Sequence, residues 1–588
     1  MAKKIKRKDA ATTVSRRTPR SHKKELNFED PEEDDKKNKV EELEKEEKTE
    51  EDAESSGEQS AWEYYMDRIE DSVTFPNVFQ LALIFFLANM VFLLYTQGKD
   101  DLRQKNDVKD TTEEDQGDPL WPIVTGGLAG GAAFLQLIVV CYSSYKNYTG
   151  RLAATEDEDE KEAIEKPQLP EFGYIYAIFA PLAVSLIKYP AKIAAIAPCI
   201  AQVPYLNPMV KVVVSFVTMY QIGIESKDAT FFEIALSPLV LAASYFLLEH
   251  FLKESLSITE RTLFSYLAVA LLVFVDDNSD VSLVIFQKLF MAFGAGLGLA
   301  ACLGDIYRSQ TPGSIAQKAV LTVIYVVFFG NSIVLSYKFL YPILGQAPWT
   351  WIVDYIRTDP QKLAIFKLWA TSSAVFVPSI LTFAKYIPFE LRRKVWHFAI
   401  FAALAYPIII EPQLTSLALV GLFGVFCLVE LARAYDLPPF GGFLRKILAP
   451  FEDKKDSKGP FVLSYLLLVL GVAVPLWLNN CSVGGSSVIG LITLGLGDSL
   501  ASLIGKAVGK IYWPETSKTA EGSFFFLIST ALALYGYQTQ EKVGYDDYAI
   551  LITSFITAAL EGNLQINDNL LVPVMGWISL EVLQRARY

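Results

Sequence analysis

The sequence predicts an all-α polytopic membrane protein with about 15 transmembrane helices and a disordered, charged N-terminal tail. Two observations predict this class. Hydrophobic residues make up 52% of the 588 residues and charged residues only 20%. Residues 1–60 alone contain 15 Lys or Arg and 18 Asp or Glu, so the remainder is poorer in charge than a soluble domain, in which about 25% of residues are charged. Long uncharged runs recur along that remainder, each close to the roughly 20 residues that cross a bilayer as a helix.

The first 74 residues are predicted to be the tail. A basic start gives way to an acidic stretch from Glu29 to Glu58. The segment has too little apolar surface to offset the entropy cost of ordering it. Because its start is charged rather than apolar, we expect no cleavable signal peptide and insertion through an internal helix.

The apolar runs then follow in order, and most are bounded by charged or turn-forming residues. Two runs separated by charged inserts come first, at 79–95 and 122–145. From residue 172 onward the candidates lie close together, at 172–187, 191–203, 207–224, 231–249, 262–275, 281–302, 316–341, 363–387, 396–410, 414–432, 461–478, 486–504, 523–537, 548–560 and 567–583. Several are short enough to be re-entrant or merged with a neighbour.

The charge pattern divides the membrane part into two regions. Residues 75–388 contain no group of charges resembling a reaction centre, so we predict that they accommodate lipid or support the fold. In residues 389–588 charged residues and glycines return at helix ends, and we predict a separate domain there.

Other classes are excluded by the composition. The five cysteines are isolated, without a CxxC pair, which argues against a disulfide scaffold. Three histidines are too few for most structural zinc sites. We expect the bilayer, and no nucleic acid, as a partner.

The loops of the second region can be assigned to sides of the membrane. Counting spans from Arg393 places three loops on one face, and these loops carry twelve basic residues. The opposite loops carry Lys542 alone, with Arg585 and Arg587 at the C-terminus. By the positive-inside rule, the basic face is cytosolic. Every polar motif described below lies on that face.

The sharpest motif spans residues 497–510. Small residues recur there at every fourth position: Gly497, Ala501, Gly505 and Gly509. Polar residues recur one position later: Asp498, Ser502, Lys506 and Lys510. In a helix the two sets form adjacent stripes. A smooth groove beside a carboxylate, a hydroxyl and two ammoniums suits a metal-bound polyphosphate, whereas the alternative is a small-residue packing face between helices.

Three further motifs lie on the same face. Lys518 to Ser523 precedes a span, and its Thr519 and Glu521 could equally form a helix N-cap. Arg393, Lys394 and His397 stand at the mouth of another span, where a histidine in an apolar helix needs a polar partner. Near the C-terminus, Glu561 is followed by Asn567, Asp568 and Asn569, which form either a helix cap or a set of oxygen ligands for Mg²⁺.

In this order the motifs resemble the CTP-dependent polyprenol kinases, the family that includes dolichol kinases. The resemblance covers 390–588, and besides the residues above it includes Glu430, Arg433, Ala434, Tyr435, Asp456, Ser457, Gly459, Pro460 and Pro573. This sequence departs from the family pattern at Lys458, which is inserted before Gly459, and at Tyr465, where a histidine is expected. Leu564 and Ile566 also replace polar residues.

The resemblance implies transfer of the γ-phosphate of CTP to the terminal hydroxyl of dolichol, giving the dolichyl phosphate used in protein glycosylation. It makes 389–588 the kinase domain, places the protein in the endoplasmic reticulum membrane and implies Mg²⁺ or another divalent cation. The expected metal ligands are Asp498, Asp568 and Asn569. Asp498, Glu521, Asp568 and His397 are the expected catalytic residues.

The expected CTP-binding residues are Gly497, Ser502, Gly505, Lys506, Gly509, Lys510, Lys518, Arg393 and Lys394. The alternatives are another CTP-using membrane enzyme, namely a diacylglycerol kinase or a phosphatidate cytidylyltransferase, and, more remotely, a transporter.

Overall fold

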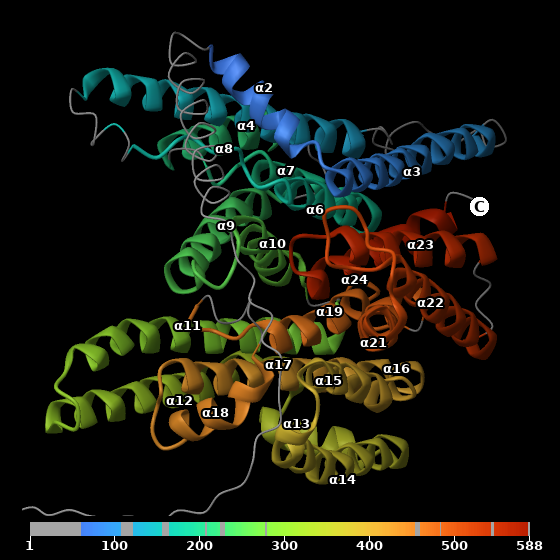
Figure 1. Ribbon diagram of the computed structural model, residues 1–588. Helices are drawn as coiled ribbons and strands as arrows, with labels where there is room; N and C mark the ends of the chain where they lie inside the picture. The colour runs from blue at the N-terminus through green and yellow to red at the C-terminus, as the bar shows by residue number, and fades with distance from the viewer. Residues whose placement is uncertain are drawn as a thin grey trace, which may run out of the picture. The chain divides into compact units, whose positions relative to one another are not determined.

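A computed structural model describes residues 60–106, 121–155, 161, 164–205, 208–223, 230–276, 279–452, 459–482, 484–541 and 546–585. These residues fold into helices joined by short connections (Figure 1). In the described ranges the only β-type pairing is one isolated bridge, between Tyr512 and Thr519. The predicted all-α class is therefore confirmed for this part of the chain.

The helices of the first region run from α2 to α14. Their bounds are α2 Ala61–Ser72, α3 Phe75–Asn106, α4 Trp121–Ala154, α6 Tyr174–Lys188, α7 Ile193–Ile200, α8 Pro208–Gly223, α9 Phe231–Leu252, α10 Ile258–Val269, α11 Val281–Ser309, α12 Ile315–Leu344, α13 Pro348–Arg357 and α14 Pro360–Phe383. The helices of the second region are α15 Phe389–Leu404, α16 Pro407–Ile410, α17 Pro412–Ala434, α18 Gly441–Leu448, α19 Ser464–Leu478, α20 Gly485–Ile492, α21 Asp498–Val508, α22 Ala520–Glu541, α23 Asp547–Asn563 and α24 Asp568–Arg585.

Nine of the described helices are long and apolar enough to cross a membrane. They are Phe75–Thr96, Trp121–Ala154, Phe231–Leu252, Val281–Ser309, Ile315–Leu344, Pro360–Tyr386, Leu391–Ile410, Pro412–Ala434 and Gly485–Val508. This is fewer than the sequence predicts, because several predicted spans form shorter helices: Tyr174–Lys188 and Ser464–Leu478 have 15 residues each, and Asp547–Asn563 has 17.

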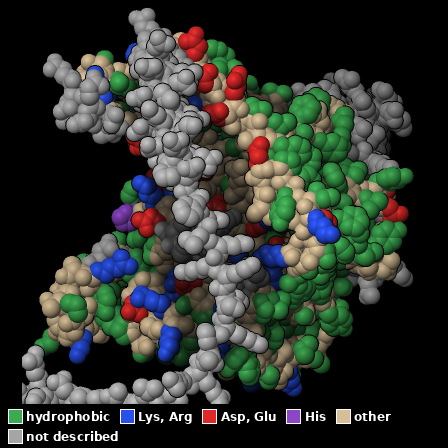
Figure 2. Space-filling model, in the orientation of Figure 1, with side chains coloured by type: hydrophobic (Ala, Val, Ile, Leu, Met, Phe, Trp, Pro, Cys, Tyr) green, Lys and Arg blue, Asp and Glu red, His purple; other side chains and the backbone are tan. Residues whose placement is uncertain are grey.

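The surface supports the membrane assignment. Large apolar side chains are exposed on many helices, such as Phe231, Ile315 and Val375, at 81%, 88% and 70%. Figure 2 shows that hydrophobic side chains cover a broad part of one face. Apolar patches of this extent mark a surface that contacts lipid or a partner, and the apolar spans make lipid the natural contact.

The structure corrects one end of the predicted tail. Residues 1–59 lie outside the described residues, but Ala61–Ser72, which the sequence assigns to the tail, form helix α2. Ser60 and Glu63 account for its start. The Ser60 amide donates to the Glu63 carboxylate at 2.9 Å, and the Glu63 amide donates to the Ser60 hydroxyl at 3.2 Å. This reciprocal capping box satisfies backbone amides that the first turn leaves without partners.

The two predicted membrane regions share one hydrophobic core. Leu87 of α3 and Tyr176 of α6 are fully buried in the same cluster as Leu476 of α19, Leu560 of α23 and Trp577 of α24. Residues 67–588 accordingly form one compact unit, without a break at residue 388. This shared core brings helices of the first region next to the polar motifs of the second.

Candidate functional site

Asp498 stands at a break in a helical span. The span Gly485–Val508 begins as α20, passes through a π-helical segment over Thr493–Gly497 and continues as α21 from Asp498. A π segment inserts extra backbone into a helix and re-aims the side chains that follow, and it is frequent at functional sites. Here the first side chain after it is a carboxylate that is only 7% exposed.

Lys394 and His397 of α15 both contact Asp498, which gives His397 the polar partner that the sequence predicts. The Lys394 ammonium pairs with Asp498 Oδ2. His397 Nδ1 lies 3.1 Å from the same oxygen and 3.0 Å from the Leu494 carbonyl oxygen of the π segment. Because both neighbours of Nδ1 are acceptors, this nitrogen carries the hydrogen and donates. His397 therefore orients Asp498, and its Nδ1 is not available as a base.

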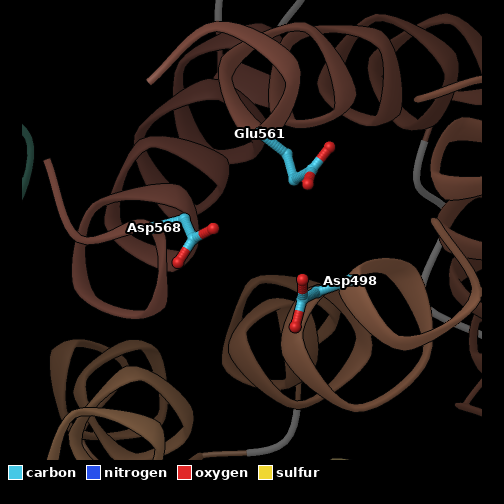
Figure 3. A group of neighbouring side chains, drawn as sticks. All are labelled: Asp498, Glu561 and Asp568. Atoms are coloured by element: carbon cyan, nitrogen blue, oxygen red, sulfur yellow. The ribbon is translucent and has the colours of Figure 1, made fainter. Parts of the chain in front are cut away.

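Two more carboxylates complete the cluster. Glu561 comes from the last turn of α23 and Asp568 from the first residue of α24. One oxygen each of Asp498, Glu561 and Asp568 lies within 4.8 Å of the others. Figure 3 shows the three carboxylates directed into one shared space from three separate helices. Among the described residues this is the one such group of potential metal ligands.

Lys518 supplies positive charge to the cluster. Its ammonium pairs with Glu561 Oε1 and lies 3.2 Å from Asp568 Oδ2. Burial alone would lower the pKa of Lys518, but the carboxylates of Glu561, Asp568 and Asp498 outweigh burial and raise this pKa above its ordinary value. Lys518 thus stays a cation while three carboxylates share one small volume.

A hairpin-like loop places Lys518. The Trp513 amide donates to the Lys518 carbonyl at 2.9 Å, and the Ala520 amide donates to the Ile511 carbonyl at 2.8 Å. The Trp513 side chain is also held in place, because its Nε1 donates to Ser523 Oγ at 2.9 Å. These bonds hold the two arms of the loop at the start of α22.

Glu521, which the sequence predicts to be catalytic, lies in the first turn of α22 and binds backbone amides of the loop after α21. Its carboxylate accepts hydrogen bonds from the amides of Lys510 and Ile511 at 3.0 and 3.2 Å. Hydrogen bonds from backbone amides lower the pKa of Glu521 below its ordinary value. The largest effect comes from the backbone amide of Glu521 itself, and the next from that of Lys510. Glu521 is outside the carboxylate cluster, and its contacts fix the loop after α21. Thr519 caps α22, accepting from the Gly522 amide at 3.2 Å, which was the alternative left open.

The glycine stripe packs against α22 and does not line an open groove. A Cβ at Gly497 would lie 2.9 Å from Thr530 Oγ1, and one at Gly505 or Gly509 would lie 2.7 Å from Thr519 Oγ1. Such distances leave no room beside these glycines for a polyphosphate. The predicted groove is therefore replaced by the alternative, a small-residue packing face. The small residues let α21 and α22 approach closely.

The sequence also predicts site residues on or near α21, α15 and α24. Ser502, in the middle of α21, is half-buried, whereas Lys506 in its last turn and Lys510 just after it are exposed. Arg393 is half-buried, one residue before Lys394. The backbone amide of Asn569 donates to Asn567 Oδ1 at 3.1 Å, so Asn567 caps α24. The helix-cap alternative for this motif is confirmed by Asn567, and the role of Asp568 as a metal ligand stays a prediction.

The cluster has the chemistry that a divalent cation requires. Carboxylate oxygens are the hard ligands that Mg²⁺ prefers, and a magnesium site bound by one or two carboxylates takes its remaining ligands from water and phosphate. Three carboxylates with shared positive partners fit such an ion. Asp498, Glu561 and Asp568 are the residues that would hold it.

Comparisons with known proteins all give the same family name. Residues 29–276 match the family model of the dolichol kinase N-terminal domain. Dolichol kinase of Saccharomyces cerevisiae is 34% identical over 233 residues, which cover 39% of this chain and 44% of the yeast protein. Dolichol kinase of Schizosaccharomyces pombe is 32% identical over 289 residues, covering 45% of this chain and 57% of its own. Human dolichol kinase is 31% identical over 259 residues, covering 40% and 48%.

The chain is similar to dolichol kinases. It spans about half the length of the curated relatives that it matches. No solved structure matches it. The family match falls largely on the region whose sequence contains no catalytic motif, so it supports the resemblance independently of the motifs in 390–588.

One departure from the family pattern has a structural account. Tyr465, in place of the expected histidine, donates its hydroxyl to Glu430, which is 2% exposed. Glu430 also accepts from Arg433 Nη2 at 2.6 Å and from the Val462 amide at 2.5 Å. Tyr465 thus supplies a donor to a buried carboxylate, as a histidine could. Asp456 and Ser457 lie outside the described residues.

Sequence reasoning missed two features of the site. Glu561 was assigned to a motif but not to the metal ligands, although it is 4% exposed and faces both other carboxylates. The π segment was also missed. Its only signal is the pair Gly495 and Gly497 before Asp498, which an uninterrupted helix would not require.

Proposed function

We propose that the protein is a dolichol kinase that transfers the γ-phosphate of CTP to the terminal hydroxyl of dolichol. The observation that carries the proposal is the cluster of Asp498, Glu561 and Asp568 with Lys518 between two of them. Phosphoryl transfer depends mainly on positioning and on neutralising phosphate charge, and this cluster supplies ligands and cations for both. The similarity to dolichol kinases supports the acceptor.

The residues divide the work as follows. Asp498, Glu561 and Asp568 hold the divalent cation, which when bound neutralises charge on the phosphate oxygens and aligns them. The ammoniums of Lys518 and Lys394 neutralise part of the negative charge of the three carboxylates. The exposed ammoniums of Lys506 and Lys510 contact the outer phosphates of CTP, and Arg393 adds charge at the mouth of α15.

The dolichol hydroxyl needs a group that accepts its proton. His397 Nδ1 is engaged with Asp498 and Leu494, so the acceptor is either Nε2 of His397 or a carboxylate of the cluster. Asp568, whose side chain is 35% exposed, is the most accessible of the three carboxylates. The prenyl chain lies among the apolar spans, and its hydroxyl meets CTP at the cytosolic side of the endoplasmic reticulum membrane.

The position of the cluster favours a kinase over a transporter. Its members come from the ends of α23 and α24 and from a break in a span, next to an exposed loop that carries Lys518. Sites in transporters lie near the bilayer midplane between repeats. Here Glu561 and Asp568 contact Lys518, which the sequence assigns to a basic loop.

Product analysis tests the proposal. Purified protein in detergent is incubated with Mg²⁺, dolichol and CTP labelled either in the γ- or in the α-phosphate. A dolichol kinase moves only the γ-label into the organic phase and releases CDP. Transfer of the α-label with release of pyrophosphate would establish a cytidylyltransferase instead, and γ-label on diacylglycerol but not on dolichol would replace the acceptor.

A further inference from the structure

The turn between α23 and α24 joins two of the three clustered carboxylates. Glu561 lies two residues before the end of α23, and Asp568 is the first residue of α24. The relative position of their side chains therefore depends on the conformation of the connecting residues 564–567. Both ends of this turn are bound by side chains from the first membrane region.

Gln80 of α3 holds the beginning of the turn. Its Nε2 donates to the carbonyl oxygen of Asn563 at 2.9 Å, and its Oε1 accepts from the Tyr176 hydroxyl at 2.9 Å. Gln80 is 1% exposed. The carbonyl of Asn563 is one of the last four of its helix, which have no intrahelical donor. Gln80 thus supplies the missing donor from a helix almost 500 residues away in sequence.

Glu260 of α10 holds the end of the turn. One carboxylate oxygen accepts from the Ser257 amide at 2.9 Å, which closes the capping box of α10. The other oxygen accepts from the Asn567 amide at 3.1 Å. Because its own helix cap fixes Glu260, the residue immediately before Asp568 is held against a rigid support.

The middle of the turn packs against the same region. A Cβ at Gly173, just before α6, would lie 2.7 Å from Ile566 Cγ2. Glycine at this position lets Ile566 approach the backbone. Ile566 is one of the residues that depart from the polar family pattern, and its contact with Gly173 explains why an apolar side chain is accommodated there.

We propose that Gln80 and Glu260 are positioning residues for phosphoryl transfer, because they fix the 564–567 turn so that Glu561 and Asp568 face Asp498. This inference rests on the proposed function and extends it, since it gives the first membrane region a part in the reaction beyond accommodating lipid. Neither side chain is a member of the carboxylate cluster. Removing groups that orient metal ligands typically lowers metal affinity or activity about 10- to 100-fold.

The decisive comparison uses two substitutions at Glu260. Glu260→Ala removes the acceptors for both the Asn567 and the Ser257 amides, whereas Glu260→Gln keeps one acceptor oxygen, which can serve one of these two amides. Glu233→Ala is the matched control, because Glu233 occupies the same capping-box position in α9 with Thr230 and is bound there to Lys192. It should cost a similar helix cap without a contact to the turn.

Three readouts are taken on full-length protein in detergent. Hydrogen exchange of the peptide covering 561–569 should be faster by about tenfold or more in Glu260→Ala, faster by a smaller factor in Glu260→Gln, and close to wild type in Glu233→Ala. Bound Mn²⁺, followed by electron paramagnetic resonance, should require an about tenfold higher concentration in Glu260→Ala, a smaller increase in Glu260→Gln and no increase in Glu233→Ala. The turnover number with CTP and dolichol should fall in parallel, with a smaller change in KM for dolichol.

Gln80→Met, of similar volume but without a donor, should give the same changes, and Tyr176→Phe, which keeps the Gln80 bond to Asn563, should give smaller ones. If Gln80→Met does not fold, the Glu260 pair decides alone. Unchanged exchange in Glu260→Ala, or equal losses in Glu260→Ala and Glu233→Ala, would overturn the inference. If wild-type protein transfers no phosphate to dolichol, the proposed function fails, while exchange and Mn²⁺ binding still test the role of the turn.

Discussion

Replacing Lys518 by methionine tests whether its ammonium is required at the carboxylate cluster. The ammonium pairs with Glu561 and lies 3.2 Å from Asp568. Removing one partner of a buried ion pair costs about 3–5 kcal/mol, and exposed pairs are worth about 1 kcal/mol or less. Since the Lys518 side chain is 36% exposed, we take about 2–3 kcal/mol as the loss of electrostatic stabilisation, and we expect the same loss in the transition state, where removal of one charge-stabilising group costs a similar amount. At 1.36 kcal/mol for each factor of ten, kcat/KM for CTP should fall by about 30- to 150-fold.

The assay measures initial rates of γ-phosphate transfer at varied CTP with purified variants at equal concentration. Lys192→Met is the matched control, because Lys192 pairs with Glu233 at 2.8 Å and is 20% exposed, away from the cluster. Lys518→Arg, which keeps the charge with a different shape, should retain part of the activity. A Lys518→Met rate within threefold of the Lys192→Met rate would refute the role assigned to this ammonium.

Three other outcomes follow from the site. Glu521→Ala should lower kcat/KM for CTP by roughly 10-fold or more, because the amides of Lys510 and Ile511 lose their acceptor. Glu521→Gln should lower kcat/KM by a smaller factor, and equal losses in the two variants would contradict the assigned contact. Gly505→Val should lower the free energy of unfolding by about 1–3 kcal/mol, since even a Cβ would lie 2.7 Å from Thr519 Oγ1; an unchanged melting temperature would contradict the packing. The raised pKa of Lys518 means that its ionic contribution is complete below the unfolded pKa of about 10.4 and is lost only as pH rises through the higher folded pKa. The rate should therefore show no Lys518-dependent decline between about pH 7 and pH 9, and a basic limb that disappears in Lys518→Met would argue against the shift.

Local patterns in the sequence were enough to predict much of the site. Apolar runs predict the helices because burial in lipid demands both length and low charge. The polar residues at span ends predict that Lys394, His397, Asp498, Lys518 and Asp568 share one face, and the structure brings all of them together.

Contacts between distant segments could not be predicted in this way. The glycines of 497–509 have the same spacing whether a stripe faces a ligand or a helix, and only the approach of Thr519 and Thr530 decides between the two. Gln80 and Glu260 carry no local signal for a role at the site, because their partners Asn563 and Asn567 are more than 300 residues away. Glu561 was likewise identifiable only from the positions of α23 and α24.

The central claim is that this carboxylate cluster transfers phosphate from CTP to dolichol. The most direct measurement follows γ-labelled CTP into dolichol with Mg²⁺, comparing purified wild type with Asp498→Asn, which keeps the volume of the side chain and a hydrogen-bond acceptor for Lys394 and His397. The account predicts labelled dolichyl phosphate from wild type and a loss of at least about 100-fold in the folded variant. Near-normal transfer by Asp498→Asn, or no label on dolichol from folded wild type, would contradict it.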